Sequence, residues 1–206
     1  MKTNNTRLLD QKENREYYSK SDGNYIDPRY ATKAHLVLDR IAWAREWIHK
    51  VGSKYHFDVG CKDGYLGLTL ASEGIKYVGI DPSKDAIDEA QLRANELDIE
   101  NATFKVEYLE DVKTSFKFDS VSMLEVLEHV LDPDEAVRKL AQLGRFVLIS
   151  TPDAEGRHGM EDSKQNEEHV RLYTAQELEA LVSQYGEVME LVKRDDQLLV
   201  IFQSAL

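Results

Sequence analysis

The stretch from Tyr55 to Gly64, YHFDVGCKDG, decides the fold that we expect for this chain. Its first half is a short, largely apolar run of the length of a buried strand, and its glycines permit a sharp turn. The next apolar segment, Leu66 to Ser72, predicts a short helix that Gly74 ends. Lys76 to Asp81 then predicts a second strand. A strand, a helix and a strand in this order indicate a right-handed parallel crossover.

The same alternation of helices and strands extends in both directions from this stretch. Upstream, apolar residues recur every three or four positions from Ala34 to Ile48, which predicts an amphipathic helix with Trp43 and Trp47 in the core. Downstream, helices are expected to begin after the capping residues Ser83, Asp132 and Thr174. Further strands are expected at Thr103 to Val106, Phe118 to Leu124, Val147 to Ser150, Val188 to Val192 and Leu198 to Phe202.

The last two expected strands are joined by the short charged turn Lys193 to Asp196, which favours an antiparallel hairpin. The whole pattern predicts an α/β protein, a three-layer α/β/α sandwich with a mostly parallel sheet and an antiparallel C-terminal strand. Residues 1–30 are polar and without apolar periodicity, and we expect them to form an N-terminal arm or lid. Residues 31–206 are expected to form a single domain.

Composition excludes several classes of protein. The chain has 206 residues, a formal net charge of −12 and a single cysteine, Cys61, which cannot form an internal disulfide. The N-terminus lacks the apolar stretch of a signal peptide, and no apolar run approaches the roughly 18 residues of a membrane span. We therefore expect a cytoplasmic protein without a membrane span. The negative charge disfavours broad binding to nucleic acid, although a small basic site is compatible with it.

The turn after the first strand marks the expected ligand site, because ligands of open α/β sheets bind at the carboxyl ends of the strands. A dinucleotide fingerprint would need glycines at positions 60, 62 and 65, but the chain has Lys62 and Tyr65 there. Asp58 would also repel a pyrophosphate and attract a ligand that carries an ammonium and a sulfonium. S-adenosylmethionine is such a ligand, and a dehydrogenase is therefore disfavoured.

The run from Asp58 to Gly64, with Val78 to Asp81, resembles the class I S-adenosylmethionine-dependent methyltransferases, whose usual run is Asp-x-Gly-Cys-Gly-x-Gly. The resemblance implies a Rossmann-like sheet. It also implies that the turn lies against the methionine part of S-adenosylmethionine, that Asp58 orients this part, and that Asp81 accepts hydrogen bonds from both ribose hydroxyls. The residues expected to contact this methyl donor are Asp58, Gly60, Cys61, Gly64, Asp81, Asp111 and Glu125.

Two details of this donor site are open at the level of sequence. Asp111 lies in the region that contacts the adenine in relatives, but Leu109 or Glu110 could be the matching residue. Lys62 stands where the family has glycine. Its side chain would crowd the donor, or it would require the backbone to stay at negative φ.

A second motif, Glu125-Val126-Leu127-Glu128-His129, follows the expected strand at Phe118 to Leu124. If the chain turns helical at Glu125, the side chains of Glu125, Glu128 and His129 project from one face. His169, from the long polar segment between Thr151 and Tyr173, could fold back as a fourth group. This set of oxygen and nitrogen ligands suits Mg, Mn, Fe, Co or Zn. Such an ion could bind an acceptor hydroxyl and lower its pKa.

Two readings without a metal stay open for this motif. His129 could act as a general base, because an imidazole can take a hydroxyl proton near neutral pH. Alternatively, the motif is structural: Glu125 and Glu128 hold loops through hydrogen bonds, and His129 packs under the sheet.

The motif resembles two branches of the methyltransferases, and both imply O-methylation. The ubiquinone-pathway O-methyltransferases share the Glu-x-x-Glu-His-Val run followed by an Asp-Pro helix start. The small-RNA 3′-terminal 2′-O-methyltransferases hold a metal with Glu-x-x-Glu-His and a later His, which Glu125, Glu128, His129 and His169 would match here.

We therefore expect an enzyme that methylates the hydroxyl of a small molecule or glycan. RNA 2′-O-methylation is the alternative, but it needs a basic groove, and this acidic chain has only scattered Lys and Arg. A third possibility is a non-catalytic binding or scaffold protein of the same fold, in which Lys62 spoils the donor site. The sequence predicts no particular oligomeric state.

Overall fold

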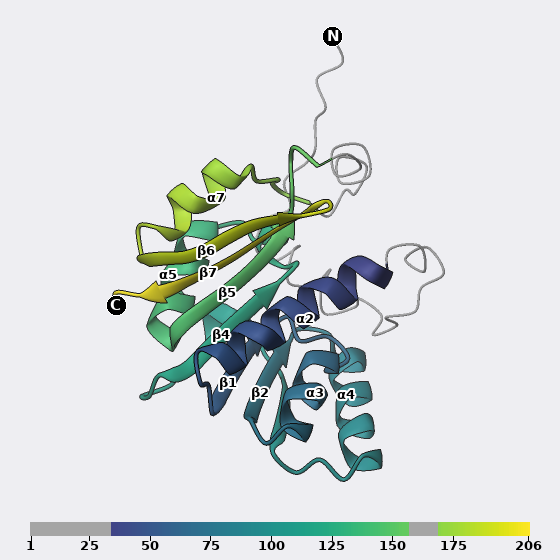
Figure 1. The fold of residues 1–206 in the computed structure, drawn as a ribbon. Helices are drawn as coiled ribbons and strands as arrows, with labels where there is room; N and C mark the ends of the chain where they lie inside the picture. Colours follow the sequence, from purple (N-terminus) through teal and green to yellow (C-terminus); the bar gives the residue numbers. More distant parts are fainter. Residues whose placement is uncertain (1–33, 157–168) are drawn as a thin grey trace.

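The computed structural model of the chain describes residues 34–156 and 169–206, and one seven-stranded sheet forms its centre (Figure 1). The strands are β1 (Tyr55–Val59), β2 (Lys76–Asp81), β3 (Ala102–Val106), β4 (Phe118–Leu124), β5 (Gly144–Pro152), β6 (Gly186–Arg194) and β7 (Gln197–Ser204). The α-helices are α2 (Ala34–Lys50), α3 (Tyr65–Ser72), α4 (Lys84–Glu96), α5 (Pro133–Leu143) and α7 (Ala175–Val182). Two short 3-10 helices are η2 (Leu109–Asp111) and η3 (Leu127–His129).

The order of the strands in the sheet is β3-β2-β1-β4-β5-β7-β6. Strands β1 to β5 pair in parallel, whereas β7 runs antiparallel to both β5 and β6. The order reverses between β1 and β4, so the carboxyl ends of these two strands flank the point where ligands bind in such sheets. The predicted fold class is confirmed, including the antiparallel C-terminal strand.

Helices cover both faces of the sheet and complete the three layers (Figure 1). One core cluster lies between the sheet and α2, α3 and α4, and the other lies between the sheet and α5 and α7. Trp43 and Trp47 of α2 are buried in the first cluster, as predicted. Their indole N–H groups both donate to Glu190 Oε1 of β6, at 3.1 and 2.7 Å. These bonds attach α2 to β6, an edge strand of the sheet.

The predicted helix starts are present because each has a side chain that satisfies backbone N–H groups. Ser83 accepts from the N–H of Ala86, and Asp132 accepts from the N–H of Glu135. Thr174 and Glu177 form the reciprocal hydrogen bonds of a capping box.

Some predictions fall on residues that the structure does not describe. The expected arm at residues 1–30 lies outside the described residues, and so does the part of the long polar segment at 157–168. Within the described residues, no helix combines the length and apolar character that crossing a membrane requires.

Candidate active site

The glycine turn that follows β1 requires glycine at two positions. Gly60 has a φ of 74° and Gly64 a φ of 78°, both in the left-handed region. A Cβ on Gly60 would lie 2.4 Å from a methyl carbon of Val126, and one on Gly64 would lie 2.7 Å from the ring of Phe104. The N–H of Gly60 donates to the carbonyl of Ile80 at 2.8 Å, which ties the turn to β2. The turn therefore packs too closely for larger residues.

Lys62 adopts a left-handed conformation as well, with a φ of 49°. The expectation that a lysine would require negative φ is therefore wrong. Its backbone N–H donates to Asp81 Oδ2 at 3.0 Å, and this bond supports the conformation. A non-glycine residue in this region costs about 1 to 2 kcal/mol. The turn thus keeps the left-handed backbone that glycine adopts readily.

Asp81 lies at the end of β2 with its carboxylate held in place by the backbone. Besides the Lys62 N–H on Oδ2, the N–H of Ser83 donates to Oδ1 at 2.8 Å. Burial raises the pKa of Asp81, while the two N–H groups and the charge of Lys62 oppose this shift. A carboxylate oxygen can accept two hydrogen bonds. The orientation therefore suits the two vicinal hydroxyls of a ribose.

Asp58 is 4% exposed and accepts hydrogen bonds on both oxygens, from Ser122 Oγ and from Tyr77 Oη. Burial raises the pKa of Asp58 to about 6, although both hydroxyls lower it. The carboxyl is therefore mostly ionised at neutral pH. Cys61 is buried nearby, and burial together with the charges of Asp58 and Asp81 raises the pKa of its thiol well above the usual range. This thiol is thus not a nucleophile near neutrality.

The expected adenine-contacting segment is η2, which follows β3. The N–H of Glu107 donates to the carbonyl of Asp81 at 3.2 Å, so this segment leaves the sheet beside the expected ribose site. Leu109 is buried, whereas Glu110 and Asp111 are exposed. The adenine contact of Asp111 stays a prediction.

The helical turn that we expected to begin at Glu125 is wrong. Glu125 has a φ of 56°, and the following turn is the 3-10 helix η3. The physical reason is Ser150 of β5: its carbonyl and its hydroxyl both accept from the Glu125 N–H, at 3.0 and 3.1 Å. The Ser150 hydroxyl also donates to Glu125 Oε1 at 2.9 Å. Glu125 is therefore held against β5 and does not start a helix.

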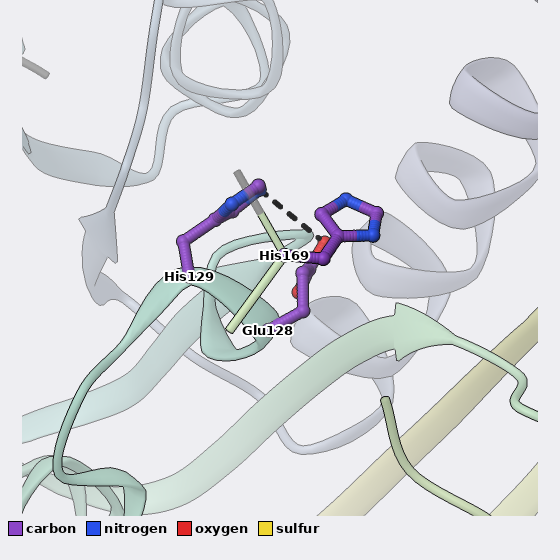
Figure 2. A group of neighbouring side chains, drawn as sticks. All are labelled: Glu128, His129 and His169. Carbon is purple, nitrogen blue, oxygen red and sulfur yellow. Dashed lines mark ion pairs between the residues drawn. The ribbon is translucent and has the colours of Figure 1, made fainter. Parts of the chain in front are cut away.

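Three of the four predicted metal ligands come together (Figure 2). Glu128, His129 and His169 each offer one ligand atom, and these atoms all lie within 4.8 Å of one another. His129 Nε2 is 3.7 Å from Glu128 Oε1, and the two imidazole rings are 4.9 Å apart. The N–H groups of Val170 and Arg171 donate to the carbonyl of Glu128, which brings His169 back to η3. Glu125 is not a member of this group.

Burial dominates the electrostatics of this cluster. Glu128 is 1% exposed, and burial raises its pKa well above the usual range, with a further increase from the charge of Glu125. Burial also raises the pKa of Glu125, while the charge of Arg40 and the Ser150 hydroxyl oppose that shift. Two neighbouring buried carboxyls are disfavoured as a pair of anions. A cation at the cluster would stabilise both in their ionised form.

The ligand atoms of the cluster have the chemical types that a divalent ion binds. Two imidazole nitrogens and one carboxylate oxygen are the ligand set of many zinc sites and of non-heme iron sites. Ligand atoms about 2.0 to 2.2 Å from one ion lie about 3 to 3.5 Å apart, so small side-chain rotations would bring these three atoms onto one ion. The group is the only one of its kind among residues 34–156 and 169–206.

Sequence reasoning missed several residues that shape the site. Arg40 of α2 acts on Glu125 and Glu128 through its charge, and this placement depends on how α2 crosses the sheet. Tyr77 and Ser122 hold Asp58. The signal for Ser122 was available, because Ser120 and Ser122 alternate with apolar residues in β4.

Comparison with known proteins shows which family the chain belongs to. Residues 31–190 match a family described as "Methyltransferase domain". The ubiquinone biosynthesis O-methyltransferase of Alkalilimnicola ehrlichii is 43% identical over 99 residues, which cover 46% of this chain and 40% of that protein. The enzyme of the same name from Bordetella parapertussis is 31% identical over 143 residues, covering 66% and 59%. The chain thus spans about half the length of the curated relatives that it matches.

Solved structures share the fold at low sequence identity. Magnesium protoporphyrin IX methyltransferase from Synechocystis PCC 6803 with bound S-adenosylmethionine has a TM-score of 0.71 at 18% identity, covering 96% of this chain and 98% of that one. The methyltransferase domain of bacterial CtHen1-CN has a TM-score of 0.66 at 19% identity, covering 80% and 97%. The ubiquinone-pathway branch that the second motif resembles therefore recurs among the similar proteins. The family match covers most of the chain and the fold agrees with it, so the chain belongs to the class I S-adenosylmethionine-dependent methyltransferases.

Proposed function

We propose that the protein transfers the methyl group of S-adenosylmethionine to the hydroxyl oxygen of a small molecule or glycan. The observation that carries this proposal is the Glu128, His129 and His169 cluster, which follows the carboxyl end of β4 next to the glycine turn. The printed names of the curated relatives, which are O-methyltransferases, support it. The net charge of −12 favours such an acceptor over RNA.

The donor would lie across the glycine turn. Asp81 would accept from both ribose hydroxyls, and ionised Asp58 would attract the ammonium of the methionine part. Gly60 and Gly64 let the backbone approach the ligand, and Lys62 preserves the shape of the turn. The sulfonium methyl would then point toward η3.

The chemistry is an in-line displacement. The acceptor oxygen forms a bond to the methyl carbon, the bond from carbon to sulfur breaks, and its electron pair stays on sulfur to give S-adenosylhomocysteine. Most of the rate would come from holding the two reactants in line. In the absence of a metal, the hydroxyl proton would pass to His129, because an imidazole can take a proton near neutral pH.

A divalent ion at this cluster is the alternative to His129 as the base. Glu128, His129 and His169 would hold it, and it would lower the pKa of the acceptor hydroxyl. We expect elemental analysis to find a stoichiometric divalent ion in the native protein and to find it lost in Glu128→Gln. Glu46→Gln, at an exposed position of α2, is the matched control and should keep the ion. Protein that turns over fully after chelation would leave His129 as the base and end the metal assignment.

The proposed reaction is tested by transfer of a radiolabelled methyl group from S-adenosylmethionine to three acceptor classes: phenolic compounds, sugars and short RNA. We expect a phenol or sugar to be labelled, and His129→Gln to lower the rate by about 100-fold or more. His49→Gln, at an exposed histidine paired with Glu73, should leave it unchanged. Labelling of RNA alone would replace the proposed acceptor class, and an unchanged rate in His129→Gln would remove the cluster from the reaction.

A further inference from the structure

A chain of hydrogen bonds crosses the core next to the glycine turn. We call it the Asp58 chain, and its members in order are Ser53, Ser120, His56, Ser122, Asp58 and Tyr77. Each link is short: the five donor-to-acceptor distances along the chain are 2.8, 2.7, 2.8, 2.5 and 2.7 Å. Every polar atom of the imidazole and of the carboxyl is therefore satisfied within the core.

The pairing of the strands places these side chains on one face of the sheet. His56 and Asp58 are two residues apart on β1, so both point to the side of α2, α3 and α4. On β4, Ser120 lies opposite His56 and Ser122 lies opposite Asp58. Tyr77 lies opposite His56 on β2. On this face of the sheet, each polar residue of β1 is thus paired with a serine of β4.

This polar row is costly for stability alone. All six side chains are at most 4% exposed. Buried polar groups gain little over well-packed apolar residues, even when their hydrogen bonds are complete. The opposite face of β1 carries Phe57 and Val59, which pack in an apolar cluster. At these two positions the strand is therefore buried without any polar side chain. Asp58 is the one carboxyl of the set, so the effect of the row falls on it.

The ionised state of Asp58 fixes the direction of every bond in the row. A carboxylate only accepts, so Ser122 must donate to it. The Ser122 oxygen can then accept a proton only from His56 Nε2. A neutral imidazole has a single N–H, so Nδ1 then accepts from the Ser120 hydroxyl. One tautomer of His56 is thus compatible with ionised Asp58.

A proton on Asp58 Oδ1 would reverse the row. Asp58 would then donate to Ser122, and Ser122 to His56 Nε2. The imidazole would then carry its proton on Nδ1 and donate to Ser120. Ser120 would donate to Ser53, whose hydroxyl lies 3.5 Å from the carbonyl of Tyr55. The row therefore links the charge of the donor-site acid to the tautomer of a histidine buried in the core.

We propose that His56 is a positioning residue for the methyl donor, which acts through Ser122 to hold Asp58 ionised and oriented toward the donor's ammonium group. This inference rests on the proposed donor site. His56 itself stays neutral, because burial lowers its pKa to about 3, so it responds by changing tautomer and not charge.

The other groups that face Asp58 do not favour its charge, apart from the hydroxyls. Burial raises its pKa to about 6, and the charge of Asp81 raises it slightly further. The Cys61 thiol and the Tyr77 phenol are neutral near pH 7, because burial raises both of their pKa values. The hydrogen bonds of Ser122 and Tyr77 are the influences that lower the pKa of Asp58. Weakening the Ser122 bond should therefore raise the pH needed to ionise Asp58.

Two substitutions of His56 separate its two nitrogens. A glutamine places its amide near the Nε2 position and can still donate to Ser122, whereas an asparagine reaches only the Nδ1 position near Ser120. The experiment is calorimetric titration of the full chain with S-adenosylmethionine from pH 5 to pH 8. Ser122→Ala is the second test variant in case His56→Asn does not fold. It removes the hydroxyl that donates to Asp58 and changes the side-chain volume less than His56→Asn does.

For the wild type, we expect half-maximal affinity near pH 6, where Asp58 becomes protonated. In His56→Asn and in Ser122→Ala this midpoint should rise by about one pH unit, which gives about fivefold weaker binding at pH 6 and near-normal binding at pH 8. His56→Gln should keep the wild-type midpoint. Loss of packing alone would weaken binding equally at every pH.

Two results would count against the proposal, and they are distinguishable. A wild type that binds S-adenosylmethionine, with the same midpoint in His56→Asn and Ser122→Ala, overturns the role of His56. A wild type that shows no binding even at pH 8 contradicts the proposed donor site itself.

Discussion

At the scale of single residues, Lys62 shows how a backbone shape survives without its usual glycine. Its left-handed φ of 49° is supported by the hydrogen bond from its N–H to Asp81. The side chain adds a positive charge that opposes the raised pKa of Asp81. Lys62 therefore supports the ribose site through both backbone and charge, which argues against a donor site spoiled by this residue.

Replacing Lys62 by glycine should stabilise the fold. Glycine relieves the left-handed strain, but it also loses more conformational entropy on folding, so we expect the free energy of unfolding to rise by only about 0.5 to 1 kcal/mol. Chemical denaturation measures this change. Lys62→Ala is the control, because it keeps the strain and removes only the ammonium. Equal stability of the two variants would mean that the backbone is not strained at this position.

Asp81 is the residue on which ribose recognition should depend most. Asp81→Asn removes two charge-assisted bonds to the hydroxyls and should weaken S-adenosylmethionine binding by about 100-fold. Asp88→Asn, at an exposed acid of α4 whose partner is Lys84, should bind normally. Titration calorimetry compares the two variants. An unchanged affinity in Asp81→Asn would place the ribose elsewhere.

At the scale of elements, local signals were sufficient for the strands and the capped helices. The helix starts at Ser83, Asp132 and Thr174 depend on bonds within three residues, which the sequence displays directly. The turn at Glu125 was mispredicted, because its conformation depends on Ser150, 25 residues later. The spacing of Glu125, Glu128 and His129 would place them on one face only within an α-helix, and no α-helix begins at Glu125.

One carboxylate, that of Glu190, accepts two hydrogen bonds from α2. Glu190→Ala removes the acceptor for both Trp43 and Trp47 and should lower the free energy of unfolding by about 1 to 3 kcal/mol. Glu187→Ala, an exposed glutamate on the same strand, is the matched control. Thermal and chemical denaturation give the comparison. Equal stability of the two variants would show that the bonds to Glu190 do not stabilise the attachment of α2.

At the scale of the whole molecule, the two proposed reactant sites are assembled from distant parts of the chain. β1 and β2 provide the proposed donor side, while η3 and His169 provide the proposed acceptor side. Arg40, from the first described helix, acts on the acidic residues of the acceptor side. The glycine turn and Asp81 were predictable, because they follow single strands. The contributions of Arg40 and Tyr77 were not, because they depend on packing between elements.

The donor site underlies every proposed step, and titration of the purified, ligand-stripped chain tests it. The chain is titrated in a calorimeter with S-adenosylmethionine and with S-adenosylhomocysteine, and NAD serves as the control ligand. We expect saturable binding of both sulfur compounds and no binding of NAD, because Asp58 and Asp81 fit an ammonium and a ribose but repel a pyrophosphate. Binding of NAD, or binding of neither sulfur compound, would contradict the account.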